Sequence, residues 1–483
     1  MQLSLELNKI AQLTFAEPYL RDYLTTTLGN DNQFHNIAQR AYAIIEQVNN
    51  AKAIQEIKHA SQGNSILSEL LVIEANTNSS TNSNTAITTN RLHYIGFVNW
   101  VITVQNVFYF QSIGDIIGYK NGEWEFNYGN PNANEDFVLR MLWDYLNLGG
   151  TANIDISNWQ MSDDTIMYNT TFTSMINTHN KEHPNDIFAN MRTAYVNDLP
   201  LMLTRDIGER TKLSLSENIK WDAVPYNSNV KGNGSMMRSG CIGLLTFGTV
   251  NRNKLIVLSV ECSRLTHNSA ITILGSVTSA LFTALAIEQV PVHLWPFQLL
   301  NLIKSKSIDN YINISRPHDH SQYLKDKIYY VTAWEDYVNT KYVNQTPRYD
   351  EKLQSNLVER YIKLKQTSSC NMFGGCADDC CIVAFDSVLM SQGNFEKMLM
   401  RSILHPGDSD TVGSVAFSWF AAAYGSKTDS DMKTFINKFK DRIESSDLIK
   451  KAFDNQSTIE YLSKVFYGNL FVHTFMKYAD TLA

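Results

Sequence analysis

Positive charge is in short supply in this chain of 483 residues. Lysine and arginine together number 41 against 48 acidic residues, which gives a formal net charge of −7. Proteins that bind nucleic acid usually present a basic surface, so this balance argues against a nucleic-acid partner. A small anionic ligand stays compatible with it, because backbone N–H groups and a bound cation can hold an anion without net positive charge.

Cysteine is also scarce. The chain has six cysteines, too few for a disulfide scaffold at this length, and the group between Cys370 and Cys381 lacks the spacing of a zinc ribbon or finger. Residues 1–20 carry Glu6 and Lys9 where a secretory signal needs an apolar run. We therefore expect reduced cysteines, no zinc site, and a soluble cytoplasmic protein.

Long uncharged runs are few. The two stretches at 92–114 and 265–287 are each long enough to cross a bilayer. Asparagine and glutamine interrupt the first, and the second is rich in serine, threonine, glycine and alanine. Both runs are typical of buried segments in a large core, so we expect no membrane partner.

Strand-like alternation is rare, whereas apolar residues recur at helical spacing along most of the chain. Helices are predicted over 137–148, 269–288 and 411–424, with Ser269 and Thr411 near the caps of the last two. The sequence predicts an all-α protein in three parts. These are an N-terminal helical segment of unassigned role at 1–75, an Asn/Ser/Thr-rich linker at 76–91, and one large domain at 92–483.

Two acidic clusters stand where helices are predicted to begin. They are Ser162-Asp163-Asp164-Thr165 and Asp408-Ser409-Asp410-Thr411. Either cluster taken alone is compatible with an ordinary helix cap. However, one carboxylate suffices for a cap, and adjacent carboxylates repel unless a cation lies between them. Brought together, the clusters would offer hard oxygen ligands for two Mg²⁺ or Mn²⁺ ions.

Two glycine-rich segments accompany the acidic clusters. The Gly232-Asn233-Gly234-Ser235 turn precedes an apolar stretch and would expose N–H groups to an anion such as phosphate, although an ordinary glycine turn fits equally well. The segment from Gly114 to Phe126 places Glu125 between two aromatic residues. Burial there would raise the pKa of Glu125 and suit it to acid–base catalysis, whereas the alternative is a solvent-facing glutamate.

Together these segments resemble the ADP-ribosylglycohydrolase family, most closely its ADP-ribosylarginine hydrolase branch. The resemblance covers residues 92–424 well and does not cover the first 90. It rests on five motifs in the family's order: Gly114-Asp115-x-x-Gly118 continuing to Trp124-Glu125-Phe126, Ser162 to Thr165, Gly232 to Arg238, Thr266-His267, and Gly407 to Thr411.

The resemblance implies a compact, orthogonal multi-helix fold around a binuclear Mg²⁺ site. It implies that Gly232, Asn233, Gly234 and Ser235 hold the diphosphate of ADP-ribose and that His267 lies near the nucleotide. Glu125 would belong to a loop that gates the site. The implied metal ligands are Ser162, Asp163, Asp164, Asp408, Asp410 and Thr411, and all six are present, which predicts an active hydrolase.

The implied reaction is hydrolysis of the N-glycosidic bond between ADP-ribose and arginine in a modified protein, by a protein acting as a monomer. Such cleavage passes through an oxocarbenium-like state. Asp163 or Asp164 would accept a proton from the attacking water, and Glu125 would protonate or position the leaving guanidine. Four alternatives stay open within the class: serine-linked ADP-ribose, ADP-ribosyl-thymidine, poly(ADP-ribose) and O-acetyl-ADP-ribose. A non-catalytic ADP-ribose-binding module is a further alternative.

Overall fold

The computed structural model of the protein describes residues 84–127, 135–178, 184–216, 219–349, 357–366, 368–370, 372–425 and 430–482. The predicted N-terminal segment, residues 1–75, lies outside the described residues, as does the predicted linker up to residue 83. Helix α6 begins at Asn84, inside that linker. Residues 103–449 form one compact unit, and residues 84–102 belong with 450–482 to another. The predicted domain boundaries stay predictions.

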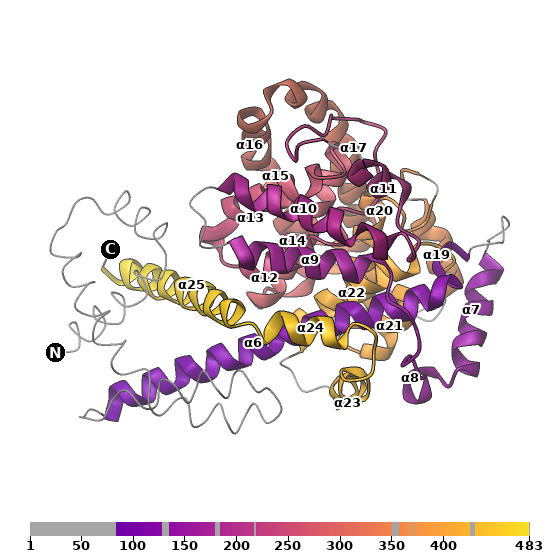
Figure 1. The fold of residues 1–483 in the computed structure, drawn as a ribbon, viewed down its shortest axis with the longest axis horizontal. Helices are drawn as coiled ribbons and strands as arrows, with labels where there is room; N and C mark the ends of the chain where they lie inside the picture. The colour runs from indigo at the N-terminus through magenta and orange to yellow at the C-terminus, as the bar shows by residue number, and fades with distance from the viewer. Residues whose placement is uncertain are drawn as a thin grey trace. The chain divides into compact units, whose positions relative to one another are not determined.

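Helices form nearly all of the regular structure, and the predicted all-α class is confirmed (Figure 1). The helices are α6 (Asn84–Tyr119), η1 (Lys120–Gly122), η2 (Glu125–Asn127), α7 (Glu135–Asn147), α8 (Gly150–Asn153), α9 (Asp163–Thr178), α10 (Pro184–Met202), α11 (Glu209–Ser216), α12 (Gly240–Leu245), η3 (Thr249–Asn251), α13 (Arg252–Arg264), α14 (Ala270–Ile287), η4 (Val292–Leu294), α15 (Trp295–Lys304), α16 (Ser307–Ser315), α17 (Pro317–Lys341), α19 (Leu357–Lys365), α20 (Ala377–Ser391), α21 (Phe395–Ile403), α22 (Ser409–Tyr424), α23 (Ser430–Phe439), α24 (Ser446–Phe453) and α25 (Gln456–Leu482). Strands β1 (Tyr342–Val343) and β2 (Thr346–Pro347) pair antiparallel, with Tyr342 opposite Pro347.

Helix α14 lies at the centre of the 103–449 unit, packed against α12, α13, α17, α20 and α22. It begins where the sequence predicts, because Ser269 caps it: the backbone N–H of Thr272 donates to the Ser269 hydroxyl at 3.3 Å. Helix α14 is long and apolar enough to cross a membrane, but 94% of that window is buried inside the protein. It is therefore a core helix, as its composition predicted.

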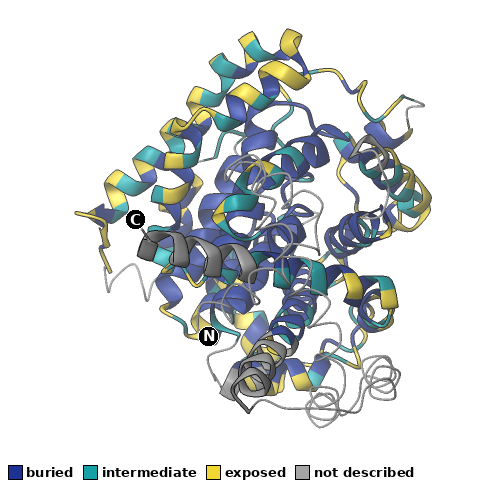
Figure 2. Cartoon of the chain, turned by 90° about the vertical axis from the view of Figure 1, so that its left-hand side faces the viewer, coloured by how far each residue is buried: buried dark blue, intermediate teal, exposed yellow. Residues whose placement is uncertain are grey.

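An aromatic cluster fills the space between α14 and its neighbours. Phe282 on α14 lies 5.1 Å from Trp419 and 5.4 Å from Phe385, measured between ring centroids. Trp295 and Trp334 complete the cluster around the same ring. Buried residues occupy the inner helices, and exposed residues lie on the outer ones (Figure 2). The cluster fixes the positions of α20 and α22, whose first turns carry acidic residues.

Helices α6 and α22 cross with their backbones in contact. A Cβ atom at Gly114 would lie 2.6 Å from the carbonyl oxygen of Gly413, and one at Gly118 would overlap the backbone of Ser409. The Ser409 hydroxyl donates to the Gly118 carbonyl at 2.7 Å, which ties the two helices together. Only glycine permits this approach, and the crossing brings the end of α6 to the start of α22.

Helix α12 packs on α14 with equal closeness at Gly243. A Cβ atom there would lie 2.8 Å from the backbone nitrogen of Ala284 and would overlap the carbonyl of Ala280. We predict that Gly243→Ala lowers the free energy of unfolding by about 2 kcal/mol or more, because backbone cannot move aside as a flexible side chain can. Urea unfolding measures the loss.

Gly208→Ala is the matched control for this substitution. Nothing lies within 4 Å of a Cβ atom built at Gly208, and its backbone needs no left-handed conformation. Equal unfolding midpoints for the two variants would contradict the tight packing of α12 on α14.

Candidate active site

The two acidic clusters of the sequence meet at the first turns of α9 and α22. The Thr411 hydroxyl donates to the Oδ1 atom of Asp164 across 3.4 Å and links the clusters directly. Carboxylate oxygens of Glu125, Asp408 and Asp410 lie within 4.8 Å of one another, and all three residues are buried. Segments more than 240 residues apart therefore form one acidic site. Of the predicted metal ligands, these contacts bring together Asp164, Asp408, Asp410 and Thr411, with Glu125, predicted as a proton donor, beside them.

Asp115 on α6 holds the first turn of α9 in place. Its carboxylate accepts hydrogen bonds from the backbone N–H groups of Ser162 and Thr165 at 3.2 Å, and from the Thr165 hydroxyl. These contacts orient Asp163 and Asp164 toward α22. Asp115 belongs to the Gly114-to-Gly118 motif, but its residue type and position alone predicted no role for it. The available signal was its place between Gly114 and Gly118, where α6 comes closest to α22.

The loop that carries Glu125 is anchored on both sides. On one side, the Trp124 indole donates to Asp144 of α7 at 2.9 Å. On the other, the backbone N–H of Phe126 donates to the Gly407 carbonyl at 2.7 Å, next to Asp408. Phe126 has a φ of 47°, in the left-handed region. These constraints hold Glu125 among the other carboxylates with 7% of its surface exposed.

The glycine loop predicted to hold a diphosphate lies against the acidic site. The Asn233 amide donates to the Oδ2 atom of Asp408 at 2.9 Å and to the Gly374 carbonyl at 2.8 Å. Gly232 forms a short antiparallel bridge with Cys376. Within the described parts of the chain, the backbone N–H groups of Gly234 and Ser235 have no hydrogen-bond acceptor. The loop therefore has two backbone donors available for an anion.

Ser235 and His267, both predicted to contact the ligand, are buried in the protein interior. The Ser235 hydroxyl is hydrogen-bonded inside the core, to Ser263 at 3.0 Å and Ser276 at 3.1 Å. The His267 ring lies beside Gly234 and bonds to the Thr266 hydroxyl at 2.7 Å. Burial lowers the pKa of His267 well below its usual value, and Arg238 lowers it further, so the ring is neutral. His267 can offer a neutral donor or acceptor near the loop.

Burial and mutual repulsion dominate the electrostatics of the acidic site. Burial raises the pKa of Asp163 to about 8, with Asp115 and Asp408 adding to the effect. The pKa values of Glu125, Asp164 and Asp410 rise well above their usual range for the same reasons, burial first and neighbouring carboxylates second. Such a group of carboxylates binds protons or cations strongly.

The donor set suits magnesium or manganese. It consists of carboxylate and hydroxyl oxygens, which hard divalent cations prefer, and within the described residues no cysteine or histidine joins the cluster of Glu125, Asp408 and Asp410. The Oδ2 atom of Asp164 is buried and has no hydrogen-bond partner. A buried carboxylate oxygen without a partner is costly, and a cation beside it would remove that cost.

The cysteines contradict one expectation from the sequence. Cys370 and Cys376 form a disulfide, with Cα atoms 6.2 Å apart, where reduced cysteines were expected. The bridge closes the loop that carries Gly374, and Asp379 caps the same loop by accepting from the N–H groups of Gly374 and Cys376. The low cysteine content of the chain argues only against a scaffold of several disulfides. It does not exclude one disulfide within a short loop, so the expectation of reduced cysteines was wrong for this pair. The four cysteines between 370 and 381 do not gather as metal ligands in the described residues.

The sequence pattern of one protein family, described as ADP-ribosylglycohydrolase, matches residues 106–457, and this range contains the acidic site and the glycine loop. The chain belongs to the ADP-ribosylglycohydrolase family. A protein of Acanthamoeba polyphaga mimivirus named as an ADP-ribosyl glycohydrolase, L444, is 43% identical over 383 residues, which is 78% of this chain and 74% of that protein. Family membership supports hydrolysis of an ADP-ribose linkage.

Two further similarities are weaker. ADP-ribosylhydrolase ARH1 of Dictyostelium discoideum is 30% identical over 342 residues, covering 65% of this chain and 84% of that protein. A solved chain titled as an ADP-ribosylglycohydrolase-related protein complex has a TM-score of 0.40 at 14% identity, over 76% of this chain and 99% of that chain. The last similarity is too low to carry an argument about this fold or its function.

The raised pKa of Asp163 predicts a pH effect in metal-free protein. A carboxyl whose folded pKa exceeds its unfolded value stabilises the fold fully below the unfolded value, and this stabilisation is lost as pH rises through the folded one. The unfolded value is 3.8 and the folded value about 8. In EDTA, Asp163→Asn should therefore gain stability over the original protein between pH 5 and 8, on the order of 1 kcal/mol per pH unit.

Thermal unfolding at several pH values measures this difference. Asp155→Asn is the control, since Asp155 is exposed and its pKa is lowered by hydrogen bonds from Ser157. A constant stability difference between Asp163→Asn and the original protein across this pH range would contradict the electrostatic description of the site.

Proposed function

We propose that this protein is a Mg²⁺-dependent hydrolase that cleaves the N-glycosidic bond between ADP-ribose and an arginine side chain of a modified protein. The observation that carries the proposal is the single buried site formed by Glu125, Asp163, Asp164, Asp408 and Asp410, beside a glycine loop with two free N–H donors. The motif that runs from Gly118 to Phe126 and resembles the arginine-specific branch supports the choice of linkage.

The acidic site would hold two divalent cations, with Ser162, Asp163 and Asp164 on one side and Asp408, Asp410 and Thr411 on the other. When bound, these cations would supply Lewis-acid activation and orientation at the ribose. Asp115 and Asn233 take part indirectly, because the first fixes the start of α9 and the second holds the Asp408 carboxylate. The chain would thus position the proposed ligands before any substrate arrives.

Two proton transfers complete the hydrolysis. Water adds at C1″ of the ribose and loses a proton, which Asp163 or Asp164 accepts. The C1″–N bond breaks, and the leaving guanidine nitrogen gains a proton from Glu125. Without cations, burial and acidic neighbours raise the pKa of Glu125, Asp163 and Asp164 alike. Cations bound by Asp163 and Asp164 would keep these two ionised, whereas Glu125, which is not a metal ligand in this proposal, would stay protonated. The loop keeps Glu125 largely buried, since the Trp124 and Phe126 hydrogen bonds anchor it on both sides.

The direct test is release of ADP-ribose from a peptide modified on arginine, with and without Mg²⁺, followed by chromatography. A panel with serine-linked ADP-ribose, poly(ADP-ribose) and O-acetyl-ADP-ribose tests the linkage. Release from another linkage alone would redirect the proposal to that substrate. Binding of ADP-ribose by calorimetry with no release from any substrate would indicate a non-catalytic binding module instead.

Asp410→Asn should lower kcat by about 100-fold or more while the protein stays folded, because one charged metal ligand is lost. Loss of Mg²⁺ binding, measured by calorimetry, should accompany the loss of activity. Asp155→Asn, at an exposed site, is the control and should keep full activity. An Asp410→Asn variant with unchanged turnover would refute the ligand assignment.

Glu125→Gln should lower kcat by roughly 100-fold with little change in KM, because glutamine keeps the shape of the side chain but cannot transfer a proton. Glu123→Gln is the matched control on the same loop, where Glu123 is exposed and pairs with Lys120. Similar losses in the two variants would show that the loop, rather than the Glu125 carboxyl, limits the reaction.

A further inference from the structure

A cavity of about 450 Å³ lies between α17, α19 and α20, and none of its lining residues belongs to the acidic site. Its size is that of a pocket for a small organic molecule rather than for a single ion. Five cationic side chains and two acidic ones line it, an excess of three positive charges. The cationic residues are Lys341, Arg348, Arg360, Lys363 and Arg401. In a chain with a net charge of −7, such an excess indicates a site for an anion.

Asp386 on α20 organises the charged end of this cavity. Its carboxylate accepts from the Arg360 Nε atom at 2.8 Å, from the Lys341 Nζ atom at 2.9 Å, and from the Tyr337 hydroxyl at 2.9 Å. Arg360 also donates to the Arg401 carbonyl at 2.7 Å. Arg360, Asp386 and Arg401 are each at least 95% buried. These contacts and this burial therefore fix Arg360, Asp386 and Arg401 at the charged end of the cavity.

Two further cations line the cavity with no partner. Arg348 and Lys363 are exposed, and neither side chain forms an ion pair or hydrogen bond within the described parts of the chain. Burial lowers the pKa of Arg401 to about 10, and repulsion from the neighbouring Arg360 guanidinium lowers it further. An anion placed among these side chains would relieve that repulsion.

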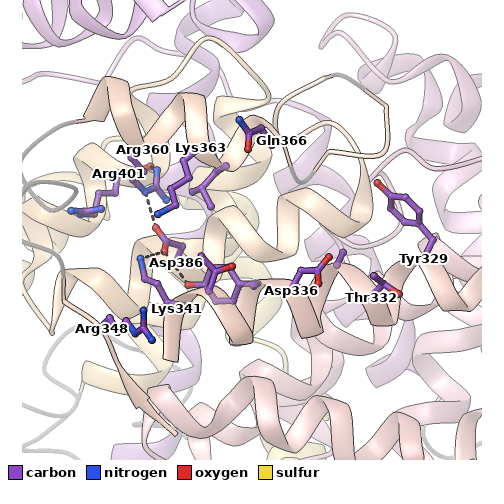
Figure 3. Close-up of a pocket in the computed structure, with 14 residues that line it drawn as sticks. Tyr329, Thr332, Asp336, Lys341, Arg348, Arg360, Lys363, Gln366, Asp386 and Arg401 are labelled. Atoms are coloured by element: carbon purple, nitrogen blue, oxygen red, sulfur yellow. Dashed lines mark hydrogen bonds and ion pairs between the residues drawn. The ribbon is translucent and has the colours of Figure 1, made fainter. Parts of the chain in front are cut away.

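The charges gather at one end of the cavity. Figure 3 shows the cationic side chains grouped around Asp386, whereas Tyr329 and Thr332 lie at the other end. Tyr329 and Lys341 both belong to α17 and are twelve residues apart, which corresponds to about 18 Å along a helix. Tyr329 is 45% exposed as a whole residue. One charged end and one polar, partly aromatic end fit an elongated ligand with its negative charge concentrated at one terminus.

We propose that this cavity binds a small phosphorylated molecule, with its phosphate among Lys341, Arg348 and Lys363 and its organic part along α17 toward Tyr329. Lysine and arginine side chains at one end of a cavity match the charge of phosphate, and the planar arginine fork also matches its geometry. An acidic peptide fits less well, because its charges would need cations spread along the cavity. The proposal does not depend on the reaction assigned to the acidic site.

Calorimetry with inorganic pyrophosphate tests the phosphate end, using the full chain in EDTA so that no cation competes for the probe. The original protein should bind pyrophosphate, and the double variant Arg348→Gln/Lys363→Gln should bind it at least about tenfold more weakly, since two charged contacts are lost. Both substitutions lie at exposed side chains without partners, so the fold should be unaffected, and thermal unfolding checks this.

Lys365→Gln is the matched control, because Lys365 lies on the same helix, two residues from Lys363, and does not line the cavity. It should bind pyrophosphate as the original protein does. No binding by the original protein, or equal binding by the double variant, would overturn the proposal, and the second result would place the probe at another site such as the glycine loop. Tighter binding of an aspartate-rich hexapeptide, weakened by the same double variant, would also overturn it in favour of a peptide site.

Discussion

The crossing of α6 and α22 brings two backbones into contact, because Gly114 faces the carbonyl of Gly413 and Gly118 faces that of Ser409. This approach places Asp115 beside the start of α9, where it accepts from two backbone N–H groups and a hydroxyl. The first turns of α9 and α22 then lie close enough for Thr411 to reach Asp164. A larger side chain at Gly114 or Gly118 would separate the helices and with them the two acidic clusters.

The sequence predicted the parts of the site better than their connections. The acidic clusters, the glycine loop and Glu125 could each be found from residue type and local pattern, and the helices over 269–288 and 411–424 agree with α14 and α22. The contacts of Asp115 with α9 and of Asn233 with Asp408 could not, because they join residues that are about 50 and 175 positions apart. Local periodicity contains no information on such pairs.

The cationic cavity likewise could not be predicted from local sequence patterns. Lys341, Arg360 and Arg401 belong to three different helices, and each is an ordinary charged residue in its own segment. Asp386 is equally inconspicuous within the apolar sequence of α20. Only packing of these helices on one another gathers the cations around one carboxylate. The disulfide between Cys370 and Cys376 was missed for a related reason, since overall cysteine content does not describe one loop.

The acidic site and the cationic cavity each contain a buried aspartate, and the two aspartates have opposite pKa shifts. Burial alone would raise the pKa of both Asp163 and Asp386. The pKa of Asp163 is raised, by burial first and then by the neighbouring Asp115 and Asp408 carboxylates. By contrast, Lys341 and Arg360 overcome the burial of Asp386 and hold its pKa well below its usual value. Asp386 is thus charged and satisfied by the chain itself, as expected of a structural residue. Within the described residues no ion pair joins Asp163, Asp164, Asp408 or Asp410 to a lysine or arginine, and this is the physical reason to expect cations at the acidic site. The expectation of an anion at the cavity rests instead on Arg348 and Lys363, whose charges Asp386 does not compensate.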